Sequence, residues 1–145
     1  MDPLNIDGLP ANALVLVDTA PIIYVLEGHP RFARRFLPLF EAYEAGALQL
    51  AVTTVTIAEV LTGPEQAKNH ALASQYSEVF RSWTVIALDF DIAVRAAGLR
   101  AMYRLKLPDA VQAASALAIN ADALLTHDRD FSRLGPRLTS MRIIC

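Results

Sequence analysis

The sequence predicts an α/β fold, namely a three-layer α/β/α sandwich around a central, mainly parallel sheet of about five strands. Five short runs rich in apolar residues are typical of strands that are covered on both faces, at 14–17, 49–53, 84–88, 123–126 and 139–143. Stretches with helical periodicity lie between these runs, among them 108–120. Strands that alternate with helices build parallel sheets of this kind.

The composition is that of one domain. The chain has 145 residues, of which 54% are apolar and 19% charged, so a single core is expected and disorder is excluded. We expect residues 1–145 to form this domain, with residues 1–12 as a flexible N-terminal tail because they contain Pro3, Gly8 and Pro10 and little periodicity.

Targeting and redox features point to the cytoplasm. The first residues lack the basic and apolar stretches of a secretion signal, and no apolar run approaches the roughly 18 residues that would cross a membrane. The only cysteine is Cys145, which excludes an internal disulfide. The net charge of −2 is not that of a general nucleic-acid binder, although 13 residues are Lys or Arg.

Acidic residues occur where the predicted strands end. In open α/β sheets, ligand sites form beyond the carboxyl ends of the strands. Four acids lie at or near such positions: Asp18, Glu59, Asp109 and Asp128. Asp128 is preferred to Asp130 because it is closer to the strand end, and Asp130 is expected to face solvent or to cap a turn.

Each acid also has a structural interpretation. Asp18 fits the N-cap of a helix that starts near Pro21. Glu59 fits a capping box with Thr56, unless the cap lies earlier, at Thr53 or Thr54, which frees the Glu59 side chain. That helix is expected to stop at Gly63-Pro64. Asp109 suits the positive end of a helix dipole, and His127 is expected to face solvent.

Taken together, the four acids indicate a metal site. Carboxylates that converge on one sheet edge repel one another unless cations neutralise them. Oxygen ligands select hard divalent ions, so Mg²⁺ or Mn²⁺ is expected. Such ions serve the hydrolysis of phosphate esters.

Four segments, in this order, resemble the motifs of the PIN-domain ribonucleases, and most of all the VapC toxins of toxin–antitoxin pairs. They are VLVDTAPIIY at 15–24, TVTIAEVLTG at 54–63, LPDAVQAASA at 107–116 and LLTHDRDF at 124–131. The resemblance runs from about residue 14 to the end. It implies a PIN-like sandwich and a metal-dependent enzyme that cuts RNA to leave 5′-phosphate and 3′-hydroxyl ends.

The resemblance also implies roles for individual residues and partners. The catalytic, metal-binding quartet would be Asp18, Glu59, Asp109 and Asp128, with Thr19 and Thr126 as supporting hydroxyl residues. We expect Asp18 and Asp109 to bind the principal ion directly. Glu59 and Asp128 would bind through water, orient the nucleophile or complete a second ion site. A homodimer and a small inhibitory antitoxin protein are the implied partners, and no membrane is involved.

Basic side chains are candidates to contact the RNA backbone. They are Arg31, Arg34, Arg35, Arg95, Arg100, Arg104, Lys106 and Arg129. The alternative for each of them is a solvated helix face. Contacts of this kind would make binding sensitive to salt without giving sequence preference.

Other functions remain open. The fold could serve as a catalytically idle RNA- or protein-binding dimer, or as a housekeeping RNA-processing nuclease. An aspartyl phosphotransferase is disfavoured because Ala20 stands where a second Asp is usual. A P-loop nucleotide hydrolase is excluded and a dinucleotide cofactor is not supported, because the glycine motifs of both are absent. We expect Asp18→Asn and Asp109→Asn to abolish cleavage and, by relieving repulsion, to preserve or raise stability without metal.

Overall fold

The strands of the described residues form one parallel sheet. The computed structural model describes residues 2–134 and 142–144. The strands are β1 (Ala13–Val17), β2 (Leu48–Thr53), β3 (Thr84–Ile86), β4 (Ala123–Leu125) and β5 (Arg142–Ile144). They lie in the order β3-β2-β1-β4-β5, and each neighbouring pair is parallel. The predicted sheet is confirmed, while residues 139–141 of its predicted last strand lie outside the described residues.

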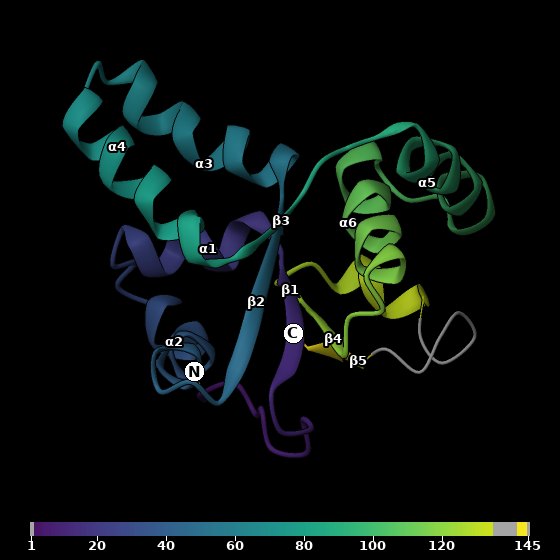
Figure 1. The fold of residues 1–145 in the computed structure, drawn as a ribbon, viewed down its shortest axis with the longest axis horizontal. Coiled ribbons are helices and arrows are strands. Elements are labelled where there is room, and N and C mark those ends of the chain that lie inside the picture. The colour runs from purple at the N-terminus through teal and green to yellow at the C-terminus, as the bar shows by residue number, and fades with distance from the viewer. Residues whose placement is uncertain (1, 135–141, 145) are drawn as a thin grey trace.

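Helices cover both faces of this sheet (Figure 1). On one side lie α1 (Thr19–Leu26), α2 (Ala33–Glu44), α3 (Thr54–Gln66) and α4 (His70–Val79), which runs into the short 3₁₀ turn η1 (Phe80–Ser82). On the other side lie α5 (Phe90–Tyr103) and α6 (Leu107–Ala118). A second 3₁₀ turn, η2 (Arg129–Leu134), follows β4. The predicted α/β/α sandwich is therefore confirmed.

Alternate residues of the central strand supply the two halves of the core. Leu16 packs in a buried cluster that includes Ala113 of α6. Its neighbours Val15 and Val17 belong to a second cluster, which includes Phe36 of α2. Successive side chains of a strand point to opposite faces, so an apolar run buries residues against both helical layers. This explains why the strand reads as a continuous apolar stretch instead of an alternating one.

The strand order creates a switch point between β1 and β4. From β1 the chain moves outward to β2 and β3, and it returns through α5 and α6 to the other side of β1, where β4 and β5 add to the sheet. Just beyond the end of β1, the backbone N–H of Asp18 donates to the carbonyl of Leu125, the last residue of β4, at 2.8 Å. The segments that leave β1 and β4 are therefore held side by side at the place where open sheets form their ligand sites.

Two helices continue through prolines. The predicted stop at Gly63-Pro64 is wrong, because α3 runs on to Gln66. A proline inside a helix cannot donate a hydrogen bond to the carbonyl four residues earlier. Pro64 is buried, and the apolar contact of its ring offsets this loss. Likewise α2 passes Pro38 as one helix.

The N-terminal segment packs against the domain. Residues 2–12 form neither helix nor strand, as expected. Leu4 is buried, and its backbone N–H donates to the carbonyl of Arg35 at 2.8 Å. Arg142 donates to the carbonyl of Asp7 at 2.8 Å. None of the helices in the described part of the chain combines the length and hydrophobicity that a membrane crossing requires.

Candidate metal centre at the carboxyl edge of the sheet

A cavity of about 480 Å³ opens at the carboxyl edge of the sheet, and the four predicted carboxylates all line it. They come from four parts of the chain: the end of β1, the second turn of α3, the first turn of α6 and the loop after β4. The wall of the cavity consists of Asp18, Thr19, Ala20, Ile23, Tyr24, Glu59, Pro108, Asp109, His127, Asp128 and Arg129.

Asp18 combines the two interpretations that its sequence position allows. It is the N-cap of α1, and its Oδ1 accepts the backbone N–H of Thr19 at 2.8 Å. The same oxygen accepts the side-chain amide of Gln112 at 2.9 Å, and Oδ2 accepts the hydroxyl of Thr126 at 2.9 Å. A carboxylate has about four acceptor positions. With these three bonds made, one position on Oδ2 remains.

Thr126 joins the ends of β4 and β1. Its side chain is fully buried. While its hydroxyl donates to Asp18, the same oxygen accepts the backbone N–H of Asp128 at 2.9 Å. Asp128 in turn accepts the backbone N–H of Asp130 through Oδ1 at 2.8 Å. Asp128 rather than Asp130 therefore lines the cavity, and its backbone is tied to the carboxylate at the end of β1.

Glu59 is free of the helix cap, because the cap lies earlier. Thr53 is the N-cap of α3, and its hydroxyl accepts the backbone N–H of Thr56 at 3.2 Å. The exposed carboxylate of Glu59 accepts the hydroxyl of Thr19 through Oε1 at 3.1 Å. The early cap that the sequence left open is confirmed, and it turns Glu59 toward the start of α1.

Asp109 combines an unpartnered oxygen with an electrostatic environment that is unfavourable for a negative charge. Its Oδ2 is buried and meets no hydrogen-bond partner among the residues that the structure describes. Burial, the negative charges of Asp128 and Asp18, and a side-chain hydrogen bond with Asp128 raise the pKa of Asp109 from 3.8 to about 6, against the opposing charge of Lys106. The electrostatic environment therefore disfavours the negative charge on this side chain, and a cation would reverse that preference.

The four carboxylates share one cavity but do not meet at one point. Within residues 2–134 and 142–144, no group of three or more Asp, Glu, His or Cys side chains is arranged closely enough to hold a metal ion. Like charges repel, and a cation would draw these side chains together. The chemistry of the donors suits such an ion, because all of them are carboxylate oxygens and one of these is buried without a partner.

Gln112 is a site residue that was not predicted from the sequence. It lies on α6, three residues after Asp109, and is 1% exposed. The side-chain amide of Gln112 is hydrogen-bonded to Asp18, Thr56 and Thr53. The residue therefore lies between β1, β2 and α3. A single amide on a helix face made of alanine and valine is the signal that points to it. Its partner Asp18, however, is 94 residues away in the sequence, and no local pattern reveals that contact.

The expectation that His127 faces solvent is wrong, because the side chain lies in an aromatic cluster. Its Nδ1 makes a hydrogen bond of 3.0 Å with the hydroxyl of Tyr24. The rings of Phe32 and Phe36 meet the imidazole edge-on at 4.7 and 5.5 Å. Burial, and then the positive charges nearby, lower the pKa of His127 below its ordinary value. A neutral imidazole and a tyrosine therefore form one wall beside the carboxylates.

The predicted RNA-binding cations divide into two groups. Arg129 lines the cavity, and the charge of Lys106 acts on Asp109. The charge of Arg35 reaches His127, although its guanidinium also lies over the ring of Phe36 and donates to a backbone carbonyl near the N-terminus. The others are exposed on or next to α2 and α5 and do not line the cavity: Arg31, Arg34, Arg95, Arg100 and Arg104.

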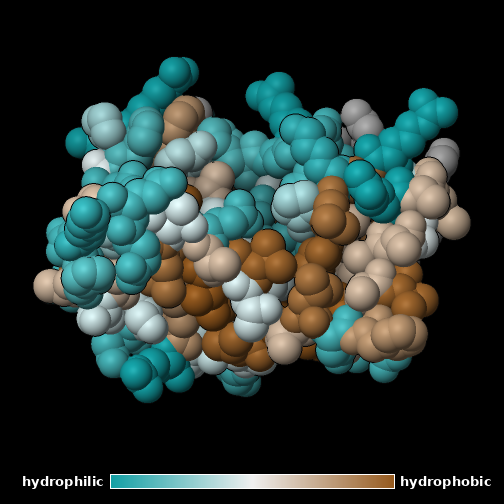
Figure 2. Space-filling model, turned by 90° about the horizontal axis from the view of Figure 1, so that it is seen from above, coloured by the Kyte–Doolittle hydropathy of each residue, from teal (hydrophilic) through white to brown (hydrophobic). Residues whose placement is uncertain are grey.

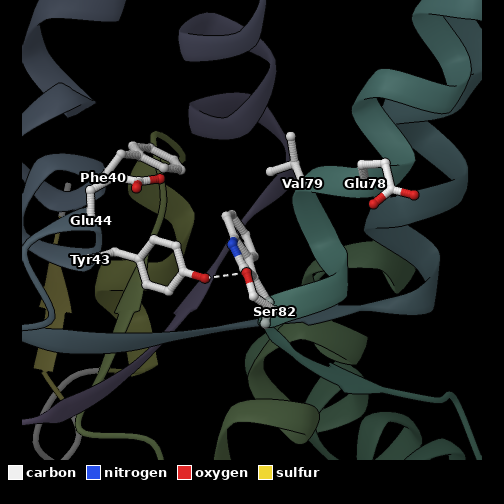
Figure 3. A pocket seen from close by; sticks show the side chains of 7 residues that line it. Phe40, Tyr43, Glu44, Glu78, Val79 and Ser82 are labelled. Carbon is white, nitrogen blue, oxygen red and sulfur yellow. Dashed lines mark hydrogen bonds between the residues drawn. The ribbon is translucent and has the colours of Figure 1, made fainter.

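A second cavity, of about 430 Å³, lies between α2 and the end of α4 (Figure 3). Tyr43 and Ser82 are hydrogen-bonded across it, and Trp83 forms part of its wall. It has two carboxylates, of which Glu78 is already paired with Arg81 at 2.7 Å. Its aromatic lining and its single unshared acid make it a poorer cation site than the first cavity.

Fold and site together define a parallel α/β protein with an acidic cavity at the switch point of its sheet. A model of the PIN domain matches residues 15–135, which is most of the chain, and the chain therefore belongs to the PIN-domain family. Among proteins of curated function, none matches the sequence significantly.

Solved structures of toxin–antitoxin systems have the same fold. A chain of a toxin–antitoxin complex from Klebsiella pneumoniae is 28% identical, with a TM-score of 0.67 over 89% of this chain and 99% of that one. VapBC2 of Rickettsia felis, bound to a DNA fragment from its promoter, has a TM-score of 0.69 at 18% identity, covering 90% and 96%. VapC20 of Mycobacterium tuberculosis, a toxin that cleaves the Sarcin-Ricin loop, has a TM-score of 0.69 at 15% identity, covering 83% and 95%. The chain is thus a PIN-domain protein whose fold is similar to that of VapC toxins.

Proposed function

We propose that this chain is a ribonuclease that depends on Mg²⁺ or Mn²⁺, and that it is the toxin of a toxin–antitoxin pair. The observation that carries the proposal is Asp109, a carboxyl with a buried oxygen that lacks a hydrogen-bond partner among the described residues and a pKa raised by burial and by neighbouring acids. Membership of the PIN-domain family supports a nuclease. RNA as the substrate is supported by the structural likeness to a toxin that cleaves the Sarcin-Ricin loop.

Asp18 and Asp109 are the direct ligands in this proposal. Asp18 has one acceptor position left on Oδ2, and Asp109 has the unpartnered Oδ2. Hard divalent cations prefer such oxygens, and Mg²⁺ in particular is held by one or two carboxylates plus substrate phosphate. When bound, the cation neutralises charge on the phosphoryl oxygens and makes a nearby water more acidic.

Glu59 and Asp128 act on water in this proposal. The carboxylate of Glu59 is exposed and is held through Oε1 by Thr19, which leaves Oε2 to accept a hydrogen from the attacking water. Asp128 is half-buried, its Oδ1 accepts a backbone N–H, and its carboxyl is hydrogen-bonded to that of Asp109 in the cavity wall. Both side chains therefore combine one fixed oxygen with capacity to orient water.

Arg129 and Lys106 contact the RNA backbone close to the site. Arg129 belongs to the cavity wall, and Lys106 immediately precedes α6. We also propose more distant backbone contacts on α2 and α5, from Arg31, Arg34, Arg35, Arg100 and Arg104. Phosphate contacts are electrostatic, so cleavage would weaken steeply as salt is raised.

A second copy of this chain is the partner proposed for α5. Ile92, Ala96 and Leu99 of this helix are buried. Phe90 and Val94 lie on the opposite side of the helix and are 81% and 58% exposed. Figure 2, seen from the side toward which the strands run, shows hydrophobic residues in a band that reaches the side of α5. An exposed apolar helix face of this kind is typical of an association surface.

The second proposed partner is a small antitoxin protein. The structures that resemble this chain include toxin–antitoxin complexes from Klebsiella pneumoniae and Rickettsia felis. An antitoxin would keep the nuclease inactive while both proteins are in the cytoplasm with the RNA. A short reading frame next to the gene, whose product co-purifies with this chain and blocks cleavage, would support this partner.

A cleavage assay tests the enzyme. Purified protein is incubated with looped and single-stranded RNA in Mn²⁺, and again with EDTA. We expect cleavage only with Mn²⁺, products with 5′-phosphate ends, and a loss of about 100-fold in Asp109→Asn, since the metal supplies several kcal/mol to such reactions. Glu41→Gln, an exposed acid on α2, is the matched control and should cleave normally.

Two results would contradict the proposal. Equal cleavage by Asp109→Asn, or cleavage in EDTA, would mean that the carboxylates are not the catalytic site. A wild-type protein that binds RNA without cutting any of it in Mn²⁺ would favour the idle binding dimer instead.

A further inference from the structure

Gln112 is an amide in an interior that is otherwise almost wholly apolar. It lies on α6 among buried alanines and Val111 and is 1% exposed. Burying an amide costs several kcal/mol unless its hydrogen bonds are replaced. Its contacts therefore indicate what the side chain does.

The contacts fix the orientation of the amide. Nε2 donates to Oδ1 of Asp18 at 2.9 Å and to the hydroxyl oxygen of Thr56 at 2.6 Å. On the other side, Oε1 accepts the hydroxyl of Thr53 at 3.0 Å. A carboxylate only accepts hydrogen bonds, so the nitrogen, and not the oxygen, must face Asp18. Both amide hydrogens are then used.

From this amide, a chain of hydroxyls leads to Glu59. Because Thr56 accepts the amide hydrogen, its own hydroxyl hydrogen can be donated to Thr19, whose oxygen is 2.9 Å away. Thr19 in turn donates to Oε1 of Glu59 at 3.1 Å. An acceptor-only carboxylate stands at each end, so this direction of donation satisfies every group along the chain.

We propose that Gln112 is a positioning residue that couples Asp18 to Glu59. One amide hydrogen holds Asp18 directly, and the other holds Glu59 through Thr56 and Thr19. Since the bonds to Thr19 N–H and Gln112 occupy Oδ1 of Asp18, the acceptor position that remains is on Oδ2, the oxygen proposed to bind the cation. The metal part of this inference rests on the proposed function. The coupling itself rests on the hydrogen bonds alone.

The first test uses no metal. In protein labelled with ¹⁵N, the side-chain NH₂ of Gln112 should exchange with solvent more slowly than that of an exposed glutamine. Its signals should shift in Asp18→Asn, and they should stay in place in Glu41→Gln, which removes an exposed charge on α2. Signals that do not respond to Asp18→Asn would overturn the coupling.

The second test measures Mn²⁺ binding by calorimetry, with the metal alone as the probe. Substitutions of groups that orient metal ligands typically weaken binding by 10–100-fold, so Gln112→Met should weaken it by about tenfold or more. Ser115→Ala is the matched control. It lies one turn further along α6, is 1% exposed, and its hydroxyl has no partner among the described residues. Its Mn²⁺ affinity should stay within about twofold of the wild type.

Thr19→Ala tests the outer part of the chain without disturbing the core, because Thr19 is half-buried at the cavity. It serves if Gln112→Met does not fold, and should weaken Mn²⁺ binding by about threefold, less than loss of the amide. Unchanged affinity in Thr19→Ala, or in a folded Gln112→Met, would overturn the inference while the proposed function stands. A wild-type protein that binds no Mn²⁺ would contradict the proposed function, and the amide signals would then decide the coupling on their own.

Discussion

Asp18 and Asp109 line the same cavity, yet their carboxylates are stabilised in opposite ways. Asp18 accepts three hydrogen bonds, from a helix N-terminus, an amide and a hydroxyl. Asp109 has a buried Oδ2 without a partner in the described part of the chain, and its neighbours are negative. Removing the charge of Asp18 should therefore lower the stability of the protein, whereas removing the charge of Asp109 should raise it.

Asp109→Asn should stabilise the protein in EDTA at pH 7.5. The pKa of Asp109 is about 6 in the folded chain against an ordinary value of 3.8. Stability from its neutral form is complete below pH 3.8 and is lost as pH rises through 6. The gain in the variant should be about 1 kcal/mol, or 2–4 °C, since the side chain is only half-buried and solvent screens it.

Thermal melts of both proteins from pH 5 to pH 8 measure this difference, with Glu41→Gln as the control for an exposed acid. The gap between Asp109→Asn and the wild type should narrow as pH falls. If Asp109→Asn is less stable than the wild type at pH 7.5, the negative charge of Asp109 is not unfavourable in the folded protein, which would contradict this prediction.

Asp18→Asn should destabilise the protein by about 1 kcal/mol, because one charge-assisted bond from Thr126 is lost. The sequence alone predicts preserved or higher stability at this position, and the hydrogen bonds reverse that expectation. Denaturant titration in EDTA measures the change. Equal stabilisation by Asp18→Asn and Asp109→Asn would show that repulsion outweighs hydrogen bonding at both carboxylates.

At the scale of elements, α3 depends on its cap. The hydroxyl of Thr53 accepts the backbone N–H of Thr56 and donates to Gln112. Thr53→Val keeps the shape of the side chain and removes both bonds, so it should lower the free energy of unfolding by about 1–2 kcal/mol. Thr62→Val, on the exposed side of the same helix, should cost less than about 0.5 kcal/mol. Urea titrations compare the two, and equal losses would contradict the role of the cap.

The elements also show where sequence patterns succeed and where they fail. The ends of β1 and β2 were predictable, because apolar runs mark these strands, whereas β3 and β4 end two residues and one residue earlier than predicted. The end of α3 was not predictable, because the helix accommodates Pro64 by burying it, and this burial depends on tertiary packing. The hydrogen bond between Tyr24 and His127 joins residues 103 positions apart, and the sequence around either residue does not indicate the other as its partner.

At the scale of the whole molecule, the apolar face of α5 predicts the oligomeric state. Val94→Lys places a charge in this face and should convert a dimer into a monomer, which light scattering coupled to gel filtration measures. Leu37→Lys is the control, since Leu37 is 40% exposed on α2 in the opposite layer. A wild-type protein that is monomeric at all concentrations, or a Val94→Lys variant that stays dimeric, would contradict the proposed interface.

That the four acids line one cavity could be predicted from the sequence, but the groups that support them could not. Positions 18, 59, 109 and 128 follow from motifs and strand ends, and all four side chains line the cavity. The groups that orient them are Gln112, Thr53 and Thr56, whose side chains are buried and whose partners lie far away in the sequence. A local pattern specifies which residues are acidic, whereas the packing of α6 on the sheet decides what holds them.

We propose above that the carboxylates of this cavity bind a divalent cation. The most direct measurement is the anomalous diffraction of Mn²⁺ in crystals of the protein grown or soaked with the metal. We expect an anomalous peak in the cavity from an ion coordinated by Oδ2 of Asp18 and Oδ2 of Asp109, and we expect this peak to disappear in Asp109→Asn crystals. Manganese bound only elsewhere on the molecule, or a cavity that stays free of it at saturating concentration, would contradict the account.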